Sequence, residues 1–267
     1  MSIISLISDF GHKDPYVGEM KAVILSIKPQ AQIVDISHEI EKFSIRMGAY
    51  VLASAAPYFP LDTIHVAVVD PGVGTKRRPI IAETNRNLYV GPDNGLLMLA
   101  AHKEVITNVY TIDNPKYMLP DVSKTFHGRD IFAPAAAHLA TGIKPSDFGS
   151  AIHDYVFPEF AEAQTKGGEL LGEILHLDDF GNIISNISAK DIKNAGFHES
   201  ESLIVTLGGK TLNIPFCSVY DTVPVGTSLA LIGSNNFLEV AINQGNASKI
   251  FEAQVGTTFR VSLVIPR

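Results

Sequence analysis

The segment from His65 to Arg78 constrains the fold of this chain most, because its character changes abruptly halfway along. Residues 65–69 are mostly apolar and β-branched, a pattern typical of a strand buried in a sheet. Asp70 follows at once, and then a Pro-Gly-Val-Gly turn, a threonine and three cations. Open α/β sheets place their sites where strands end, although Asp-Pro-Gly is also an ordinary turn. The segment therefore predicts a buried strand that ends in a site residue or in a plain turn.

Strands and helices are predicted to alternate through the first part of the chain. Short apolar runs at 3–8 and 33–36 predict strands like the one at 65–69. Apolar positions at helical spacing predict a helix over 17–27, and Ser44 suits the N-cap of a second, alanine-rich helix. Such alternation is typical of a mostly parallel sheet with helices on both faces.

The next segments continue this pattern less regularly. Residues 80–83 and 88–90 are predicted to form a hairpin, and residues 96–101 and 131–139 to form helices. The pattern between 105 and 122 is too weak to assign. Polar residues at the ends of these elements are expected to converge on one region; they are Asp9, Asp70, Asp93, His127 and Asp130.

A change of composition after residue 157 indicates a second domain. The sequence loses its periodicity, and a linker is expected near 165–168. Beyond it, short apolar segments broken by Gly, Asn and Pro predict a small antiparallel barrel; they are 170–177, 183–187, 203–207, 211–214, 228–232, 238–242 and 257–264. The fold class is therefore α/β, with a mostly parallel sheet flanked by helices in 1–164 and a smaller C-terminal antiparallel β-barrel in 165–267.

Composition narrows the functional classes. The 267 residues are 46% hydrophobic and 18% charged, which permits a sizeable core. The net charge is −7 and the longest basic run is 76–78, which argues against a nucleic-acid binder. The single Cys217 excludes an internal disulfide and a thiolate zinc site. Because no apolar run approaches the ~18 residues of a membrane span and no signal peptide is recognisable, we expect a cytoplasmic protein without membrane contact.

The first of two polar constellations surrounds His127. This histidine, Arg129 and Asp130 directly precede an apolar helix, where a His and an Asp often serve only as caps. Alternatively, His127 is a base or a water-positioning group that faces Asp70, because histidine titrates near neutrality. Together with Asp9, these acids and the imidazole could also form a metal site, although no HExxH or His-x-His spacing supports one.

The second constellation comprises Asp178, Phe180 and Asn182. It can be an ordinary β-turn in which Gly181 supplies an unusual backbone angle. It can also bind a ligand, because a carboxylate suits ribose hydroxyls or an ammonium, an aromatic face suits a base, and a carboxamide can contact a purine edge. A comparable polar turn occupies 243–247. Neither turn decides the function alone.

Taken together, these segments occur in the order seen in one family. Over essentially its whole length, the chain resembles the S-adenosyl-L-methionine (SAM) hydroxide adenosyltransferases, the adenosine-forming SAM hydrolases related to the fluorinating and chlorinating enzymes. The motifs that carry the resemblance are 8–11, 35–38, 69–77, 91–95, 126–130, 178–182 and 243–247.

The resemblance implies a homotrimer whose active sites lie where one subunit's N-terminal domain meets a neighbour's C-terminal domain. It also implies SAM as the substrate, adenosine as a product, and no cofactor or metal. The family's halogenating members have a tyrosine at the place of Asp70 and an additional halide-associated insertion. This chain has neither feature, so water is the expected nucleophile.

Individual residues match the family's functional positions. Asp70, Arg77 and His127 match the residues that handle the attacking water. Asp9 matches the carboxylate that holds the ribose hydroxyls, whereas the C-terminal turn at 243–247 matches less well. The full set of expected substrate contacts is Asp9, Phe10, Asp178, Phe180, Asn182, Ser234, Asn246 and Ala247.

The chemistry of SAM agrees with these residues. The sulfonium makes methionine an activated leaving group, so the enzyme must mainly orient a water in line with the C5′–S bond. A carboxylate or an imidazole can accept the proton of that water, and the sequence leaves open whether Asp70 or His127 does so. Two alternatives to SAM hydrolysis also stay open. They are a metal-dependent nucleotide or phosphoester hydrolase and a non-catalytic adenosine- or SAM-binding protein.

Overall fold

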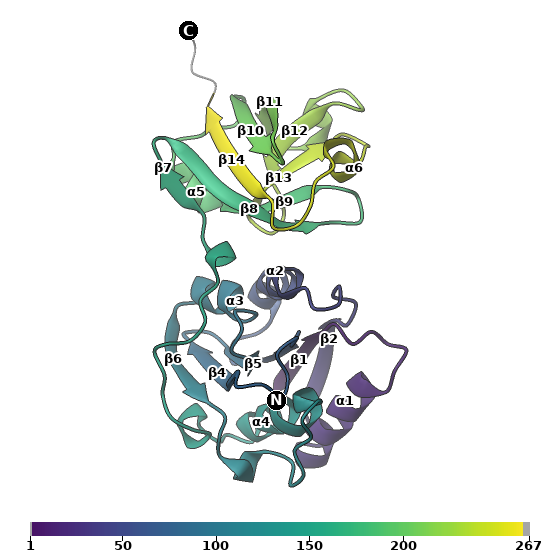
Figure 1. Cartoon of the computed structure of the whole chain (residues 1–267), viewed down its shortest axis with the longest axis vertical. Helices are drawn as coiled ribbons and strands as arrows, with labels where there is room; N and C mark the ends of the chain where they lie inside the picture. The colour runs from purple at the N-terminus through teal and green to yellow at the C-terminus, as the bar shows by residue number, and fades with distance from the viewer. Residues whose placement is uncertain (1, 264–267) are drawn as a thin grey trace. The chain divides into compact units, whose positions relative to one another are not determined.

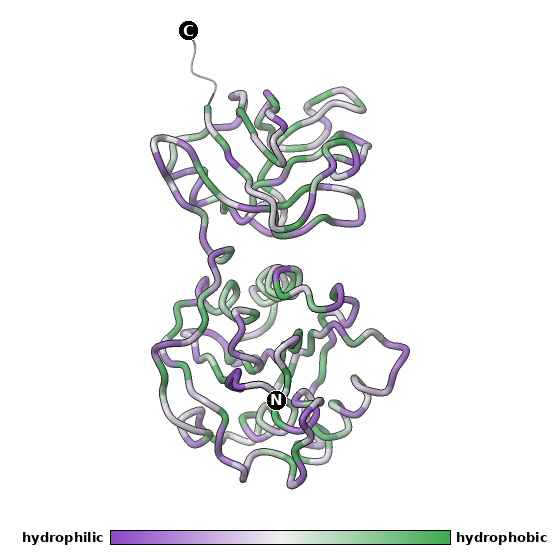
Figure 2. The backbone as a smooth tube through the Cα atoms, viewed as in Figure 1, coloured by the Kyte–Doolittle hydropathy of each residue, from purple (hydrophilic) through white to green (hydrophobic). Residues whose placement is uncertain are grey.

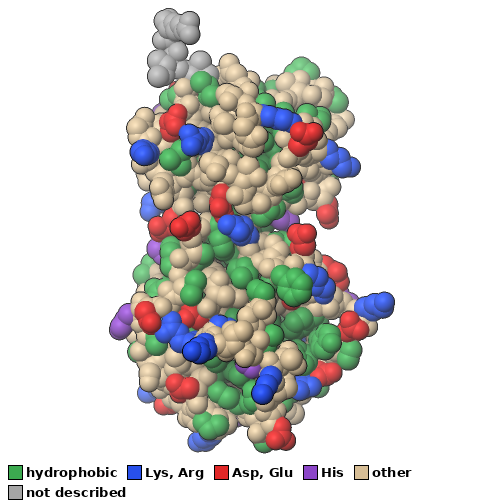
Figure 3. Space-filling model, in the orientation of Figure 1, with side chains coloured by type: hydrophobic (Ala, Val, Ile, Leu, Met, Phe, Trp, Pro, Cys, Tyr) green, Lys and Arg blue, Asp and Glu red, His purple; other side chains and the backbone are tan. Residues whose placement is uncertain are grey.

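The computed structural model describes residues 2–263, and the chain divides into two compact units, Met1–Pro158 and Glu159–Arg267. Each unit has its own buried core, and Figure 1 shows the helices and strands of both units. Among the described residues, no helix has both the length and the apolar character needed to cross a membrane. On the face shown in Figure 3, acidic and basic side chains are interspersed and form no extended basic area.

The first unit is built on a six-stranded sheet in the order β2-β1-β3-β5-β4-β6. Neighbours among β2, β1, β3 and β5 run parallel, whereas β4 is antiparallel to both β5 and β6. The mostly parallel sheet predicted for the N-terminal part is therefore confirmed. The strands are β1 (Ile3–Ser8), β2 (Gln32–Ser37), β3 (Ile64–Val68), β4 (Pro79–Thr84), β5 (Leu88–Pro92) and β6 (Ile106–Thr111).

Helices cover both faces of this sheet, with α1 and α4 on one face and α2 and α3 on the other (Figure 1). The Ser44 side chain caps α2 by accepting a hydrogen bond from the Met47 amide, as the sequence predicted. The α-helices are α1 (Tyr16–Ile27), α2 (Ile45–Ala55), α3 (Met98–Lys103) and α4 (Ala133–Ala140), and a π-helical turn, η3 (Gly128–Phe132), leads into α4. Short 3-10 turns lie at Ala56–Tyr58, Pro115–Tyr117 and Pro145–Asp147.

The core of the first unit explains the continuous apolar runs of its central strands. Ile4 and Leu6 of β1 and Val66 and Val68 of β3 are buried and pack with Phe132 and with residues of α1 and α4. The residues between them are also buried, because helices cover the opposite face. Figure 2 shows hydrophobic stretches in green running through the middle of the first unit. Complete burial of one such aliphatic side chain contributes about 1.5–3 kcal/mol, so this packing fixes the strand ends that follow.

The second unit is a β-barrel, as predicted. Seven strands run β14-β10-β11-β12-β13-β9-β8 and close through the pairing of β14 with β8, while β7 adds to the outer edge of β8. All these pairings are antiparallel except β11 with β12. The strands are β7 (Gln164–Lys166), β8 (Glu169–Leu177), β9 (Ile183–Ser188), β10 (Ser202–Leu207), β11 (Lys210–Cys217), β12 (Ser228–Ile232), β13 (Phe237–Ile242) and β14 (Thr258–Leu263).

Short helices complete the barrel unit, which is closed around buried aliphatic and aromatic side chains. A capping box formed by Ser188 and Asp191 begins the first α-helix of the unit. The helices are α5 (Ala189–Asn194) and α6 (Ala247–Phe251), with 3-10 turns at Glu159–Ala161 and Tyr220–Thr222.

Two segments differ from the sequence-based expectation. The unassigned stretch contains β6, whose side chains are only partly buried because it is an edge strand. The linker expected near 165–168 is instead the turn of the β7–β8 hairpin, in which Gly167 and Gly168 have φ angles of 62° and 83°. Glycines adopt such angles without strain, so the same residues that suggested a linker form a turn. Val264, the end of the last predicted strand, lies outside the described residues.

Candidate active site

The ends of β1 and β3 bring Asp9 and Asp70 to the same edge of the sheet. The two strands are parallel neighbours, and Ser8 is in register with Val68. The residues that follow them border a cavity of about 380 Å³. It is lined by Asp9, Phe10, Asp14, Tyr16, Lys42, Phe43, Val68, Asp70, Val73, Thr125, Phe126, His127 and Gly128.

Asp70, Arg77 and His127 form one hydrogen-bonded group beside this cavity. Arg77 Nε donates to both carboxylate oxygens of Asp70, at 3.0 and 2.9 Å, and Arg77 Nη2 donates to Asp70 Oδ2. The same Nη2 lies 2.7 Å from His127 Nδ1. The side chains of Asp70 and Arg77 are 6% and 8% exposed. A buried bidentate pair of this kind fixes the direction of both groups.

Local packing sets the place of Arg77. Its guanidinium lies over the Phe132 ring, 5.3 Å from the ring centroid, an arrangement favourable to a cation. Gly74, in the turn that connects Asp70 to Arg77, has a φ of 75°, and a Cβ there would collide with the Lys124 carbonyl oxygen. Glycine at this position therefore lets the turn approach the segment that leads to His127.

His127 is held as a neutral imidazole. Burial first, and then the positive charge of Arg77, lower the pKa of His127 below its usual value, and the nearby carboxylates oppose this only in part. Because a guanidinium can only donate, His127 Nδ1 accepts from Arg77 Nη2. The remaining ring proton of the neutral form is therefore on Nε2.

Asp9 is buried and precisely anchored by the loop that follows β2. Its Oδ2 accepts from the Phe43 amide at 2.9 Å, and its backbone carbonyl accepts from the Lys42 amino group. Asp9 is part of the cavity lining, so its second carboxylate oxygen, Oδ1, borders that space. Asp9 can therefore accept hydrogen bonds from hydroxyl groups in the cavity.

Aromatic rings form one wall of the cavity. Phe10, Tyr16 and Phe126 pack against one another with centroid separations of 5.1 to 5.7 Å. All three residues line the cavity. The structure thus places Asp9, Phe10, Asp70 and His127 around one cavity. Arg77 is bonded to Asp70 but is not among the residues that line the cavity.

The expectation that Asp130 also reaches this space is wrong. Arg129 Nε donates to Asp130 Oδ1 at 2.7 Å, and the Ser123 amide donates to Asp130 Oδ2 at 2.8 Å. Arg129 also pairs with Glu19 at 2.8 Å. Asp130 is fully buried and does not line the cavity. It holds the loop before His127 in place, because its interior position requires partners for both oxygens.

Asp93 likewise has a structural role. Arg78 donates to Asp93 Oδ2 through Nε and Nη2, at 2.9 and 2.7 Å, and the Val156 amide donates to Asp93 Oδ1 at 2.8 Å. Arg78 also pairs with Asp154. These bonds connect the last residues of the first unit to the end of β5. Of the three acids predicted to converge on one region from strand ends, Asp9 and Asp70 therefore do so and Asp93 does not.

In the second unit, Asp178 and Asn182 close a tight polar loop between β8 and β9. Asp178 accepts from the Asn182 amide at 2.8 Å and from its side-chain Nδ2 at 2.9 Å. Gly181, with a φ of 87°, lies so close to the Asn246 side chain that a Cβ would collide with it. The loop at 178–182 and the turn before α6 therefore lie together, which brings Asn246 and the buried Ala247 next to the Asp178 loop.

The side chain of Phe180 is 80% exposed at the tip of this loop. An exposed aromatic ring between polar groups can stack on a base or a planar ligand. Ser234 lies exposed in the turn between β12 and β13, whereas Asn182 and Asn246 adjoin the start of β9 and the end of β13. The preceding Gly233 lies against the Glu239 side chain, whose pKa is raised by burial and by the Asp178 charge.

The sequence did not predict several residues of the cavity lining in the first unit and of the surroundings of Asp178 in the second. Lys42, Phe43, Asp14 and Tyr16 line the cavity although none was predicted to do so. A signal for Lys42 and Phe43 was available, because they follow the strand predicted at 33–36 and parallel strands end at one edge. In the second unit, Glu239 was overlooked because it lies within an apolar strand. Burial first, and then the Asp178 charge, raise its pKa to about 7.

Among the described residues, the acids and histidines are not arranged as a metal-binding group. Within residues 2–263, no three His, Cys, Asp or Glu side chains are arranged to hold a metal ion. The donors of the hypothesised metal site are also engaged elsewhere, since Arg77 occupies both oxygens of Asp70 and Asp130 is held by Arg129 and Ser123. A cation thus already neutralises Asp70.

Together, the fold and the cavity define a two-part protein in which an α/β unit carries a hydrogen-bonded Asp-Arg-His group beside a cavity and a β-barrel follows it. Comparison with known families gives the particular class. Residues 4–149 match the SAM hydroxide adenosyltransferase N-terminal domain, and residues 172–260 match the C-terminal domain of the same family. The chain belongs to the SAM hydroxide adenosyltransferase family.

Individual relatives agree over nearly the full length. The chain is 38% identical to an (R)-S-adenosyl-L-methionine hydrolase of Thermus thermophilus, over 98% of this chain and 100% of the relative. It is 27% identical to a fluorinase of Actinoplanes sp., over 97% of each protein. A crystal structure of an uncharacterized conserved protein from Thermotoga maritima superposes with a TM-score of 0.88 at 34% identity, over 97% of this chain and 99% of that protein.

Proposed function

We propose that this enzyme hydrolyses SAM to adenosine and L-methionine, with water attacking C5′ of the ribose. The observation that carries the proposal is the Asp70–Arg77–His127 group at a cavity that also presents the Asp9 carboxylate. The family of the chain and the names of its relatives support the same reaction. Those names also favour the (R) configuration at sulfur as the substrate form.

The catalytic task follows from the substrate. Methionine leaves as a neutral thioether, so the leaving group needs no acid, and the barrier depends strongly on an oriented water. Asp70 lines the cavity and is held by two nitrogens of Arg77, which fixes its carboxylate relative to bound substrate. We infer that this carboxylate orients the water in line with the C5′–S bond.

The hydrogen bonds favour Asp70 over His127 as the proton acceptor. A neutral His127 accepts from Arg77 through Nδ1 and carries its proton on Nε2, so neither ring nitrogen is available to take a proton from water, and a backbone hydrogen bond with Ser123 also holds the ring. A carboxylate oxygen can still accept a further hydrogen bond beside the one from arginine. In the proposed step, water donates to Asp70 and accepts from His127 Nε2–H. These two hydrogen bonds direct a lone pair of the water oxygen toward C5′.

The remaining side chains are assigned to substrate recognition. Asp9 would accept the ribose hydroxyls, and Phe10 would pack on the nucleoside beside Tyr16 and Phe126. The second unit would contribute the polar loop with its exposed aromatic ring; the assigned residues there are Asp178, Phe180, Asn182, Ser234, Asn246 and Ala247. Because these residues and the cavity belong to different units, we propose a homotrimer in which neighbouring subunits share each site. A cytoplasmic location is also proposed.

One experiment tests the function directly. Purified protein is incubated with (R)-SAM and, separately, with the (S) epimer, and adenosine and methionine are quantified by chromatography, with and without EDTA. Equal amounts of adenosine and methionine, a preference for (R)-SAM and no effect of EDTA are expected. Adenosine binding without turnover would favour a non-catalytic binding protein, and loss of activity with EDTA would favour the metal-dependent hydrolase.

A further inference from the structure

A buried hydrogen bond joins the end of β1 to the loop that follows β2. Ser8 Oγ lies 2.7 Å from His38 Nδ1, and the two residues are 0% and 1% exposed. Neither residue lines the cavity. Ser8 directly precedes Asp9, the carboxylate assigned to the ribose, so this bond lies one residue behind a proposed substrate contact.

Two backbone hydrogen bonds join the two loops beside this bond, and a further bond lies within the first loop. Ser8 Oγ also accepts from the Phe10 amide at 3.3 Å. The His38 carbonyl accepts from the Gly11 amide at 2.7 Å, and the Ser8 carbonyl accepts from the Ile40 amide at 3.4 Å. The Asp9 and Phe10 backbone is thus enclosed between bonds made by Ser8 and His38. Its position depends on the loop after β2.

The direction of the buried bond follows from its partners. The Asp35 carboxylate beside Nε2 favours the ring proton on that nitrogen, so His38 Nδ1 accepts from Ser8 Oγ, which also accepts from the Phe10 amide. Nδ1 must then be unprotonated, and burial, the largest influence on His38, lowers its pKa. His38 Nε2 lies 3.2 Å from Asp35 Oδ1, without the alignment of a good hydrogen bond. His38 is therefore a neutral acceptor for Ser8.

Ser8, His38 and Asp35 have the composition of a hydrolytic triad, but the geometry excludes that role. In such triads the serine bonds to Nε2 and the acid to Nδ1, whereas here the serine bonds to Nδ1. The Ser8 side chain is also fully buried and outside the cavity, so no substrate atom can reach it.

We propose that Ser8 and His38 are positioning residues, which act through Asp9 and Phe10 to pre-form the ribose-binding side of the cavity. The inference rests on the proposed function, because it assigns Asp9 to the nucleoside. When binding residues already have the bound geometry before the substrate arrives, less free energy is needed to order them on binding. Loss of the Ser8–His38 bond should therefore weaken substrate binding and largely spare the chemical step.

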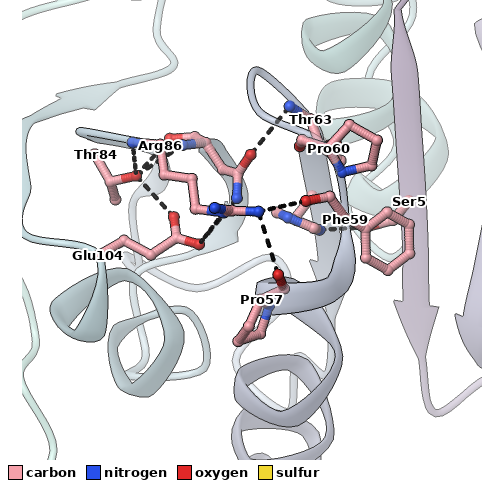
Figure 4. A network of polar contacts seen from close by, with 10 residues as sticks. Ser5, Pro57, Phe59, Pro60, Thr63, Thr84, Arg86 and Glu104 are labelled. Atoms are coloured by element: carbon pink, nitrogen blue, oxygen red, sulfur yellow. Dashed lines mark hydrogen bonds and ion pairs between the residues drawn. The ribbon is translucent and has the colours of Figure 1, made fainter.

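The same strand provides a matched control. Ser5 Oγ lies 2.6 Å from His65 Nδ1, and both residues are 0% exposed. Ser5 and His65 are register partners on β1 and β3. Ser5 lies near the polar network of Arg86 and Glu104 (Figure 4), and the Arg86 charge acts on His65. Neither Ser5 nor His65 lines the cavity. Ser5→Ala thus removes an equivalent buried serine–histidine bond away from the proposed site.

The experiment compares Ser8→Ala with Ser5→Ala by KM, kcat and thermal unfolding. Ser8→Ala should raise KM for SAM about tenfold, the equivalent of one lost hydrogen bond, while kcat changes less than about twofold. Ser5→Ala should lower the unfolding temperature similarly and leave KM unchanged. His38→Asn, whose carboxamide oxygen can accept from Ser8, should retain a KM near that of the unaltered protein, whereas His38→Ala should not.

An unchanged KM in Ser8→Ala, or an equal rise in Ser5→Ala, would overturn the inference. If Ser8→Ala does not fold, the nearly isosteric Ser8→Cys replaces it with the same expectation. Asp9→Asn separates this inference from the proposed function. A raised KM in Asp9→Asn but not in Ser8→Ala rejects only the positioning role, whereas an unchanged KM in Asp9→Asn rejects the assignment of Asp9 itself. In the Asp9→Asn background, Ser8→Ala should have little further effect.

Discussion

Arg77 Nη2 lies 2.7 Å from His127 Nδ1 and also donates to Asp70, so one guanidinium nitrogen connects the residue after β3 to a histidine that follows Arg77 by 50 residues. Because the guanidinium is planar and always protonated, it fixes both the direction of the carboxylate and the tautomer of the imidazole. The geometry of the proposed water site therefore depends on arginine specifically and not only on a positive charge.

Arg77→Lys should lower kcat about 10²-fold with little change in KM, because the positive charge remains but the two-point hold on Asp70 is lost. Steady-state kinetics with SAM measure this effect. Arg78→Lys is the matched control, since Arg78 pairs with Asp93 and Asp154 and lies outside the cavity lining. A normal kcat in Arg77→Lys would contradict the role of the guanidinium.

Asp70→Ala and His127→Ala should each lower kcat by about 10²–10⁴-fold, the range typical of a lost proton-handling group. Both variants should still bind SAM, because neither group is assigned to the ribose. Asp9→Ala should instead weaken SAM binding in isothermal titration calorimetry. Turnover at the normal rate in Asp70→Ala would show that the water site is assigned to the wrong residues.

Hydrolysis in ¹⁸O-water should place one heavy oxygen in adenosine and none in methionine, because the proposed attack is at ribose C5′. Mass spectrometry of both products measures the label. Adenosine incubated with the enzyme in ¹⁸O-water controls for exchange. Label at ribose C1′ together with free adenine would indicate glycosidic cleavage instead. A 5′-halogenated product formed in quantity with added chloride or fluoride would reject water as the nucleophile.

Light scattering should give about three times the 28.9 kDa mass of one chain, because the proposed site takes residues from neighbouring subunits. The measurement is made at the concentration used for kinetics, with specific activity followed on dilution. Activity should fall where the trimer dissociates. A mass equal to one chain, with full activity at that dilution, would reject shared sites.

Glu239→Gln should reduce the loss of stability that accompanies rising pH. The folded-state pKa of Glu239 is raised from 4.5 to about 7, chiefly by burial, so the folded protein holds a proton that the unfolded chain has released. The contribution of this proton to the free energy of unfolding is fully present below pH 4.5. It is lost as pH rises through about 7, by up to ~1.4 kcal/mol per pH unit.

Urea unfolding at pH 5 to 8 tests the Glu239 prediction. Glu239→Gln should be more stable than the unaltered protein at pH 8, because the amide carries no buried charge. Glu169→Gln, at an exposed position of β8, is the control and should retain the original pH dependence. Parallel pH profiles for Glu239→Gln and the unaltered protein would contradict the raised pKa.

The site could be predicted only in part from the sequence, because its residues come from segments that are far apart in the chain. Asp70 stands out because it directly follows a buried strand, and Asp9 follows the neighbouring one. The same criterion selected Asp93 and Asp130, which the structure places in ion pairs with Arg78 and Arg129. A polar residue at a strand end or at the start of a helix has the same sequence pattern whether it faces a cavity or neutralises a partner.

Local sequence also determined the two fold types. Apolar runs bounded by turn residues were sufficient for the strands of both units, because strand burial depends on the pattern of neighbouring residues. The pattern could not assign β6, an edge strand that is only half covered. It also could not distinguish a Gly-Gly linker from the β7–β8 turn, since glycine permits both conformations.

The sequence by itself therefore determined the strand–helix alternation, the β-rich C-terminal part and the family to which the Asp9, Asp70 and His127 motifs belong. Only the tertiary structure decided which polar groups meet. The contact of Arg77 with His127, those of Lys42 and Phe43 with Asp9, and the buried Ser8–His38 bond all join segments from different loops. Hydrogen-bond partners depend on distances of about 3 Å between side chains, and such distances arise only when the sheet aligns its strand ends.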